Sequence, residues 1–147
     1  MNLMSTVEAL KEKKDIELMK TVLKERNLRH YLLFIIGCNT GLRIGDILRL
    51  KVSDFISSGK VGKYLQVREE KTGKERRIAI NVSIQKALKL YTTHLGCAPD
   101  DYLFTSRKGQ NKPISTTQAY RILNDVAAYC RLDVHFGTHS MRKTWGY

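Results

Sequence analysis

YLLFIIGCNTGLRIGDIL, residues 31–48, is the stretch that decides the fold, because two helices of different character meet within it. Residues 31–38 are apolar on every face of a helix, which predicts a helix buried in the core. Gly41 can adopt the left-handed backbone that ends such a helix. Apolar residues then recur at helical spacing, which predicts a further helix from Arg43 to near Val52.

Amphipathic helices are predicted on both sides of this stretch. Before it, Asp15 is a plausible N-cap of a helix that ends near Arg26. After it, helical spacing of apolar residues returns over residues 84–95 and again over 119–130. Each of these segments therefore has one face available for a common core.

Strand-like sequence lies between these helices. Residues 63–68 and 76–80 are short runs with many β-forming side chains, and the connection 71–74 contains a glycine, which is typical of a β-hairpin. Residues 101–106 predict a further short strand that is followed by a loop.

A last helix is predicted to begin at His139, with Thr138 as its cap. Together these elements predict one domain over residues 1–147, mainly α with a small antiparallel β-sheet (α+β).

The charge balance favours a polyanionic partner. The formal net charge is +12 and the sequence pI is about 9.8, which is a large surplus for a chain of 147 residues. From residue 104 to 147 there are seven Lys or Arg and two acidic residues, so we expect one markedly positive face. No apolar run approaches the ~20 residues of a membrane span, and the N-terminus does not resemble a secretory signal. We therefore expect a soluble, intracellular protein.

The cysteines and histidines show no metal-site or disulfide pattern. Cys38, Cys97 and Cys130 are odd in number, widely spaced and close to apolar stretches, which predicts buried free thiols. The remaining candidates for metal ligands, His30, His94 and His135, have no ligand spacing with them, and no role is assigned to these histidines.

Arg43 is the first candidate for chemistry, because it stands where one predicted helix ends and the next begins. An arginine at a helix N-terminus can bind a phosphate through two nitrogens, and the helix dipole assists. Asp46, one turn further on, is expected to brace it. A surface ion pair between residues three apart explains the same two residues equally well.

Lys71 and the pair His139 and Arg142 are the other candidates. A lysine on a mobile hairpin tip can swing into a groove and donate a proton, although most turn lysines are simply exposed. His139 and Arg142 are three positions apart in a predicted helical turn and face the same way. They can bind a phosphoryl oxygen and move a proton, but the spacing alone is common.

Three separated motifs connect these residues. TGLRIGDILRLKVSDF (40–55), EKTGKERRIAI (70–80) and FGTHSMRKTWGY (136–147) together closely resemble the tyrosine recombinase, or phage integrase, family. In that family an arginine follows TGL, a lysine lies on a β-hairpin, and H-x-x-R comes near the end of the catalytic domain. The resemblance covers the chain from about Asp15 to its last residue.

The resemblance implies a reaction and a role for each residue. A tyrosine hydroxyl attacks a DNA phosphate, forms a 3′-phosphotyrosyl link and frees a 5′-hydroxyl, without a metal or another cofactor. Arg43 and Arg142 would stabilise charge on the non-bridging oxygens. Lys71 would protonate the leaving 5′-oxygen, and His139 would assist proton transfer at the nucleophile.

The chain departs from the family pattern at both ends. The nucleophilic tyrosine, and a His or Trp before it, are expected well downstream of H-x-x-R, but only five residues follow Arg142. Tyr147 would lie roughly 140° around the helix from Arg142, and Trp145 is interpreted as a core aromatic residue. We therefore expect a partial catalytic domain that lacks its nucleophile and is inactive alone. The N-terminal core-binding domain of the family is expected to be missing too.

The resemblance also implies the partners. These are double-stranded DNA and, in a full-length protein, further copies that form a tetramer on DNA, in the cytoplasm of a bacterium and on its nucleoid. A prophage or another mobile element is the expected context, and a chromosome-resolving recombinase is the other possibility. The basic residues expected to contact DNA are Lys74, Arg76, Arg107, Lys108 and Lys143.

Other readings of the sequence remain open. A non-catalytic DNA-binding module derived from a recombinase would keep the positive charge, but it would not need the histidine and the hairpin lysine in register. A generic RNA-binding domain would be expected to show aromatic stacking motifs, which the sequence lacks. A type IB topoisomerase uses the same phosphotyrosyl chemistry, but the residues of the three motifs favour a recombinase.

Overall fold

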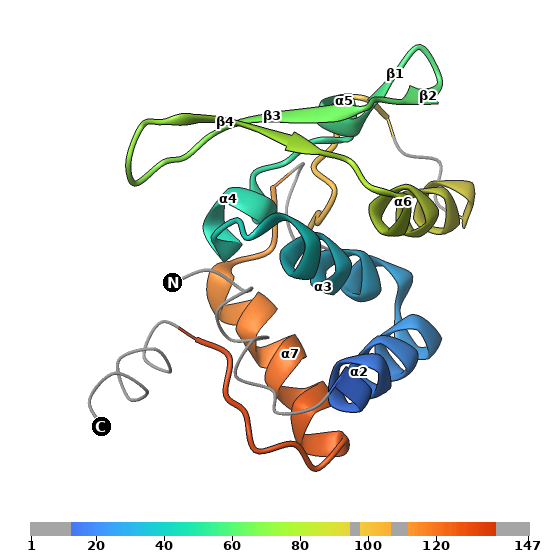
Figure 1. The fold of residues 1–147 in the computed structure, drawn as a ribbon, viewed down its shortest axis with the longest axis vertical. Coiled ribbons are helices and arrows are strands. Elements are labelled where there is room, and N and C mark those ends of the chain that lie inside the picture. The colour runs from blue at the N-terminus through green and yellow to red at the C-terminus, as the bar shows by residue number, and fades with distance from the viewer. Residues whose placement is uncertain (1–12, 95–97, 107–111, 138–147) are drawn as a thin grey trace.

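The computed structural model describes residues 13–94, 98–106 and 112–137. Helices dominate this part of the chain, and two short β-hairpins lie at one end of it (Figure 1). The last predicted helix, which begins at His139, lies outside the described residues, as do Leu95 and Cys97. No helix within the three described ranges is both long enough and apolar enough to cross a membrane.

Helix α3, Leu28–Thr40, is the central element, as its apolar sequence predicts. It packs against α2, Lys13–Arg26, on one side and against α6, Val82–His94, on another (Figure 1). The side chain of Asn27 caps its start by accepting hydrogen bonds from the backbone N–H groups of Arg29 and His30, at 2.9 and 3.3 Å. Gly41, at φ +70°, ends the helix in the predicted left-handed conformation.

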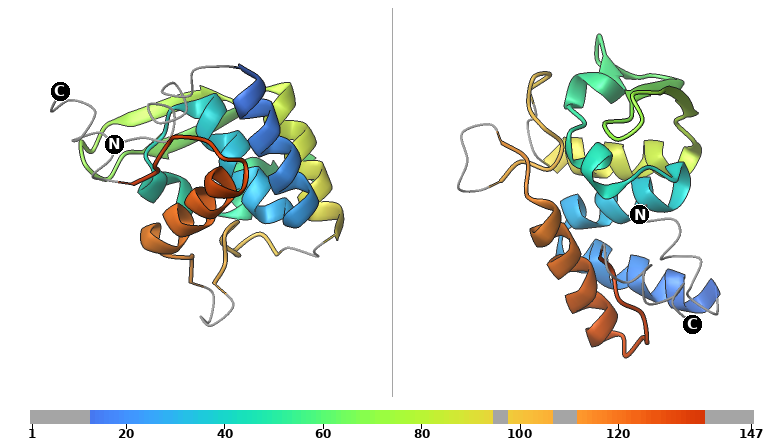
Figure 2. Two further views of the ribbon diagram at one scale, coloured as in Figure 1. Left: turned by 90° about the horizontal axis from the view of Figure 1, so that it is seen from below. Right: turned by 90° about the vertical axis from the view of Figure 1, so that its left-hand side faces the viewer.

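The core forms two clusters that meet at α3. The larger cluster joins α3 to α6, to the short helices after Gly41 and to the inner face of the longer hairpin. The smaller one joins α2, α3 and α7, Thr116–Tyr129, and includes Phe136 beyond α7. Because side chains of α3 enter both clusters, the helix is buried on nearly every face. Figure 2 shows α2, α3 and α6 side by side, with α7 on the side of α2 and α3.

The helix predicted from Arg43 is present but ends at Leu48 rather than near Val52, and two short helices occupy this part of the chain. They are α4, Ile44–Leu48, and α5, Val52–Phe55. Leu50 accepts a backbone hydrogen bond from Leu103 at 3.1 Å, and Val52 donates one to Asp101 at 2.9 Å. These long-range bonds pull the backbone out of the helix between α4 and α5, which local periodicity does not reveal.

The sheet prediction was correct in kind but incomplete. The longer hairpin pairs β3, Tyr64–Arg68, with β4, Glu75–Ala79, as predicted. A second hairpin pairs β1, Ile56–Ser57, with β2, Lys60–Val61, so two antiparallel sheets are present rather than one. Its turn residues Ser58 and Gly59 both have positive φ, which is the conformation of the commonest two-residue hairpin turn.

Two further local predictions were wrong. Asp15 is not the N-cap of α2, because the helix already includes Lys13; it lies in the first turn, where its charge still favours the helix dipole. Residues 101–106 form no regular strand in the described structure and make isolated bridges, from Tyr102 to Lys51 and from Thr105 to Pro113. Pro113 has no N–H to extend such a ladder.

Candidate active site around Arg43

The backbone places Arg43 at the junction of α3 and α4. Its neighbours Leu42 and Ile44 are buried in the core, and Gly41 turns the chain between the two helices. Arg43 itself has an extended backbone, at φ −68° and ψ 149°, and occupies the N-cap position of α4. The buried neighbours hold the backbone in place, so the guanidinium group projects from a well-defined position.

The guanidinium group of Arg43 is only partly used by the described protein. Its Nη1 lies 4.0 Å from Oε2 of Glu69, and its side chain is 32% exposed. The same nitrogen is buried and has no hydrogen-bond partner among the described residues. Because the rest of the guanidinium group is partly exposed, Arg43 is suited to bind an incoming anion.

Asp46 does not brace Arg43 as the sequence suggested. Its buried carboxylate accepts hydrogen bonds from the side chain of Arg49 and, at 3.2 Å, from the backbone N–H of Glu70. Arg49 also pairs with the carboxylate of Glu70. The partner of Arg43 is instead Glu69. The sequence offers little signal for these ion-pair partners, because the pairing depends on how the hairpin packs against α4.

Lys71 lies in the loop between β3 and β4, where the sequence places it. It is exposed, and Gly73 supplies the positive φ that the loop needs. Arg43 and Lys71 line one cavity of about 340 Å³, together with α4 and the first turns of α7. The full lining is Arg43, Ile44, Gly45, Asp46, Arg49, Glu70, Lys71, Thr116 and Tyr120. The fold therefore brings two of the predicted catalytic residues to the same opening.

Tyr120 and Thr116 are contributions to this cavity that sequence reasoning missed. Both follow from the position of α7, whose first turns form one wall. Partial burial raises the pKa of Tyr120 above its ordinary value of 10.0, so its hydroxyl stays protonated at neutral pH. The sequence indicates these two residues only through the strong amphipathic pattern of α7. That pattern does not predict which cavity the polar edge of the helix lines.

His139 and Arg142 lie outside the described residues, but the chain that leads to them is held firmly. The side chain of Asn124 on α7 accepts from the backbone N–H of Phe136 at 2.7 Å and donates to its carbonyl at 2.9 Å. The Phe136 ring meets Phe34 edge to face, with centroids 6.5 Å apart. The segment after α7 runs back alongside that helix in both figures that show it (Figures 1 and 2).

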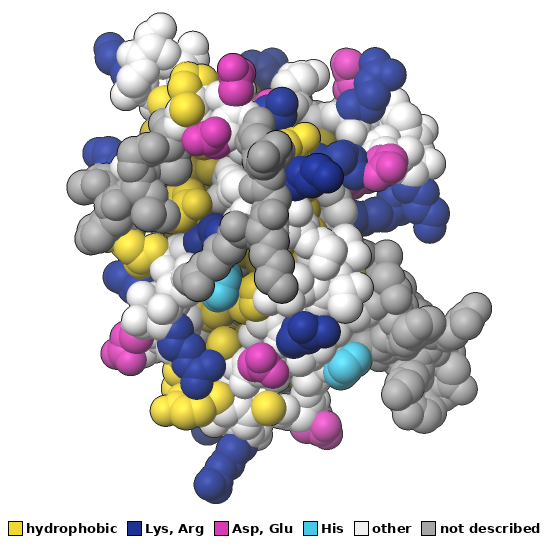
Figure 3. All heavy atoms as spheres, turned by 180° about the vertical axis from the view of Figure 1, so that it is seen from behind, with side chains coloured by type: hydrophobic (Ala, Val, Ile, Leu, Met, Phe, Trp, Pro, Cys, Tyr) yellow, Lys and Arg dark blue, Asp and Glu magenta, His cyan; other side chains and the backbone are white. Residues whose placement is uncertain are grey.

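The basic residues predicted to contact DNA have different surroundings. Lys74 is exposed beside Lys71, whereas Arg76 is half-buried and donates to the carbonyl of Thr40 at 3.5 Å. Arg107, Lys108 and Lys143 lie outside the described residues. On the face shown in Figure 3, lysines and arginines are spread widely and acidic side chains lie among them. That face is mixed in charge rather than uniformly positive.

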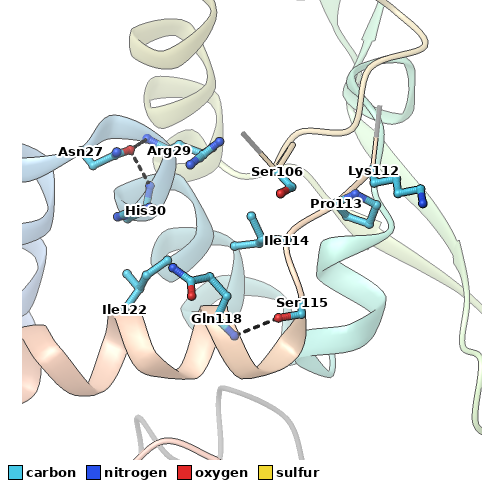
Figure 4. A pocket seen from close by; sticks show the side chains of 10 residues that line it. All are labelled: Asn27, Arg29, His30, Ser106, Lys112, Pro113, Ile114, Ser115, Gln118 and Ile122. Atoms are coloured by element: carbon cyan, nitrogen blue, oxygen red, sulfur yellow. Dashed lines mark hydrogen bonds between the residues drawn. The ribbon is translucent and has the colours of Figure 1, made fainter. Parts of the chain in front are cut away.

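A larger cavity, of about 780 Å³, lies on another side of α7 (Figure 4). Gln118 and Ile122 of α7 line it opposite Asn27 and Arg29 at the start of α3. Arg29 donates to the carbonyl of Thr105, and its buried Nε has no partner among the described residues. None of the predicted catalytic residues in the described ranges lines this cavity, so the first turns of α7 separate it from the Arg43 site.

The two cysteines that the structure describes are free thiols. Cys38 and Cys130 are both half-buried rather than fully buried. Burial raises the pKa of Cys38 from 9.0 to about 12, and it also raises the pKa of Cys130. Both thiols are therefore protonated at neutral pH and are poor nucleophiles.

Comparisons with known proteins identify the family of the chain. The phage integrase family model matches residues 8–147. The probable integrase/recombinase YoeC of Bacillus subtilis is 41% identical over 144 residues, which cover 98% of this chain and 75% of that protein. A tyrosine recombinase of Pseudothermotoga lettingae is 26% identical over 120 residues. These residues cover 82% of this chain and 40% of that protein.

Solved structures show the same fold. XerA recombinase matches with a TM-score of 0.68 at 22% identity, over 91% of this chain and 47% of that one. The catalytic core of lambda integrase matches with a TM-score of 0.63 at 20% identity, over 85% of this chain and 71% of that one. Because the family model matches almost the whole chain and the Bacillus protein is 41% identical over 98% of it, the chain belongs to the phage integrase family, and it has the fold of a tyrosine recombinase catalytic domain.

Proposed function

We propose that this domain activates a DNA phosphate for cleavage and rejoining in site-specific recombination, through a 3′-phosphotyrosyl intermediate. The observation that carries the proposal is the cavity lined by both Arg43 and Lys71, where the guanidinium side chain is 32% exposed and the lysine is exposed. Family membership supports the reaction class. The structure of lambda integrase bound to DNA supports duplex DNA as the partner.

Arg43 would contribute charge stabilisation. In the transition state, negative charge builds up on the two non-bridging oxygens of the scissile phosphate. A guanidinium group held by a rigid backbone can meet that charge without reorganising, and one such donor is worth about 10²–10³ in rate in other enzymes. We propose that Arg142 approaches the same phosphate from the segment that follows Phe136, and that His139 moves a proton at the attacking oxygen.

Lys71 would act on the leaving group. The tyrosine oxygen forms a bond to phosphorus while the bond from phosphorus to the 5′-oxygen breaks, and the ammonium group of Lys71 donates its proton to that oxygen. The products are a 3′-phosphotyrosyl link and a free 5′-hydroxyl. Attack by a 5′-hydroxyl of another strand reverses the step, because the phosphodiester energy is kept in the covalent link.

We propose that the nucleophilic tyrosine is not among residues 1–147 and that this chain alone binds DNA without cleaving it. Tyr147 stands five positions after Arg142, which would place it roughly 140° away around a continuous helix. The Bacillus relative is also longer than the matched region. In a full-length protein, assembly of four copies on DNA is proposed by analogy with the lambda integrase tetramer on a Holliday junction. Action on the bacterial chromosome or on a mobile element is part of the same proposal.

The experiment measures binding and covalent capture separately. The 147-residue chain should bind duplex DNA with an affinity that falls steeply with salt, and it should form no covalent adduct on a nicked suicide substrate. In a full-length recombinase that contains this domain, Arg43→Ala should lower the cleavage rate by about 10²-fold or more.

Arg121→Ala, at an exposed arginine of α7, is the charge-matched control and should keep cleavage. Normal cleavage by the Arg43→Ala protein would refute the assignment of the site. A covalent adduct at Tyr147 would refute the proposed absence of the nucleophile. Binding by a full-length protein that never forms an adduct would instead favour a non-catalytic DNA-binding module.

A further inference from the structure

A small network of charged residues joins α4 to the hairpin loop that carries Lys71. We infer that Arg49, together with Asp46 and Glu70, is a clamp that holds Lys71 in position to protonate the leaving oxygen, which makes Arg49 a positioning residue. The inference rests on the proposed function, because it assigns Arg49 a role through Lys71. It goes beyond that function by naming a residue outside the four that the family motifs supply.

Arg49 connects two elements because its two terminal nitrogens bind different partners. Arg49 follows α4 directly, as its C-cap. Its Nη2 donates to the carboxylate of Asp46 in α4, and its Nη1 donates to the carboxylate of Glu70 in the loop. One guanidinium group therefore bridges the helix that follows Arg43 and the residue immediately before Lys71.

Asp46 is the fixed point of the clamp. Its side chain is only 3% exposed, although it carries a charge. The same oxygen that accepts from Arg49 also accepts from the backbone N–H of Glu70 at 3.2 Å. A buried carboxylate requires such donors, because a charge that is buried without partners is costly. The loop backbone thus helps to satisfy a charge that belongs to α4.

The loop transmits this restraint to Lys71 because it is closed by its own hydrogen bonds. The N–H of Glu69 donates to the carbonyl of Lys74, and the N–H of Gly73 donates to the carbonyl of Glu69, both at 2.8 Å. The hydroxyl of Thr72 accepts from the N–H of Lys74 at 3.2 Å. With both ends joined in this way, holding Glu70 also holds the backbone of Lys71.

The clamp differs from an ordinary surface ion pair in what it joins. Arg68 and Glu75, 3.2 Å apart, form an exposed pair that only links β3 to its own partner strand β4. Arg49 and Glu70 are also partly exposed, at 40% and 76%, so the pair by itself adds little to overall stability. We therefore expect the ion pair of Arg49 and Glu70 to affect the position of the loop. Arg68→Ala, which breaks the exposed pair of Arg68 and Glu75, provides a matched control.

A positioning role makes a specific chemical prediction. Loss of the clamp should slow only those reactions that need a proton from Lys71. In a DNA substrate with sulfur in place of the 5′-bridging oxygen, the leaving group is a thiolate. Its conjugate acid has a pKa near 8.5, so this leaving group needs no proton donor. Arg43 should remain necessary for both substrates, because the charge on the non-bridging oxygens is unchanged.

The experiment compares single-turnover cleavage of the oxygen and sulfur substrates by a full-length recombinase that contains this domain. Arg49→Ala should slow the oxygen substrate by about 10–100-fold, since small displacements of a catalytic group have effects of this size. It should leave the cleavage rate of the sulfur substrate nearly unchanged, as Lys71→Ala should. The double variant should be no slower than Lys71→Ala alone. Glu70→Ala, which keeps the backbone bond to Asp46, should show a weaker form of the same pattern.

Hydrogen exchange in the 147-residue chain tests the clamp without any cleavage. The amides of Glu70 and Gly73 should exchange faster in the Arg49→Ala protein and should be unchanged in the Arg68→Ala protein. Unchanged exchange of both amides in the Arg49→Ala protein would overturn the clamp. Equal slowing of the two substrates by Arg49→Ala would overturn its role through Lys71. If Lys71→Ala itself slowed both substrates equally, the proposed role of Lys71 would fail instead.

Discussion

Arg43, the N-cap of α4, and Asp46, within α4, have different surroundings because one side chain is 32% exposed and the other only 3%. Both side chains border the same cavity, and within the described residues Nη1 of Arg43 and Oδ2 of Asp46 have no hydrogen-bond partner, whereas Oδ1 of Asp46 accepts from Arg49 and from the backbone of Glu70. The first residue is left able to bind an anion, and the second ties two elements together. Oε2 of Glu69 lies 4.0 Å from Nη1 of Arg43, at ion-pair rather than hydrogen-bond distance.

Cys38 gives a prediction at the level of a single residue. Because burial raises its pKa from 9.0 to about 12, the folded protein at pH 8 should contain about a thousandfold less Cys38 thiolate than the unfolded chain. Alkylation by iodoacetamide should therefore be slow in the native state. Mass spectrometry of the alkylated peptide, with a urea-unfolded sample as control, measures the difference. Equal labelling of the two samples at pH 8 would contradict the raised pKa.

The same shift affects stability in alkaline solution. The folded state holds the Cys38 proton more tightly than the unfolded state does, so this contribution is fully present below pH 9. It should be lost progressively as the pH rises from 9 to about 12.

At the level of elements, the junction of α3 and α4 depends on the conformation of one glycine. Gly41 has a φ of +70°, which other residues rarely adopt, and no atom would contact an added Cβ there. Gly45 lies inside α4 without such a φ, and an added Cβ would be 3.9 Å from Nη1 of Arg49, an ordinary contact. Backbone conformation, rather than space, therefore sets the requirement for glycine at position 41.

This contrast gives a matched pair of variants. Gly41→Ala should lower the free energy of unfolding by about 1–2 kcal/mol, because it forces an alanine into the left-handed region. Gly45→Ala should be neutral or should raise it by up to about 1 kcal/mol, because alanine is the better helix former. Urea unfolding followed by circular dichroism measures both. The prediction is wrong if the midpoint for Gly41→Ala equals that of the unsubstituted protein.

At the level of the whole molecule, α3 joins two core clusters that serve different parts of the site. The larger cluster supports α4 and the β3–β4 hairpin, and through them Arg43 and Lys71. The smaller cluster holds α2, α7 and Phe136, and so fixes the chain a few residues before His139. The relative position of the two halves of the proposed site therefore depends on how α7 packs on α3.

Asn124 is the place where this arrangement can be tested. Asn124→Ala removes both hydrogen bonds to the backbone of Phe136 and should lower the free energy of unfolding by about 1–3 kcal/mol, because two partly buried backbone groups lose their partners. Amide exchange should rise most in residues 132–137 and least in α3 and α6. Asn124→Asp keeps the acceptor for the N–H of Phe136 and loses only the donor, so its effect should be smaller. A uniform rise across all helices would show that Asn124 supports the whole fold instead.

Local sequence was sufficient for the elements that rest on periodicity or turn chemistry. The buried helix α3, its end at Gly41, the β3–β4 hairpin and α7 were all predicted correctly, because each signal lies within a few residues of the structure it specifies. The motifs around Arg43 and Lys71 also indicated the family, which the comparisons confirm. The roles of these residues, and of His139 and Arg142, remain predictions from the motifs.

Tertiary structure alone decided the features that join distant parts of the chain. The break between α4 and α5 follows from backbone bonds to residues 101–103, and the pairing of Asp46 with Arg49 and Glu70 follows from how the hairpin packs. The cavity shared by Arg43 and Lys71 has the same origin. The physical reason is that periodicity and turn preferences act over a few residues, whereas these contacts depend on the packing of whole elements around α3.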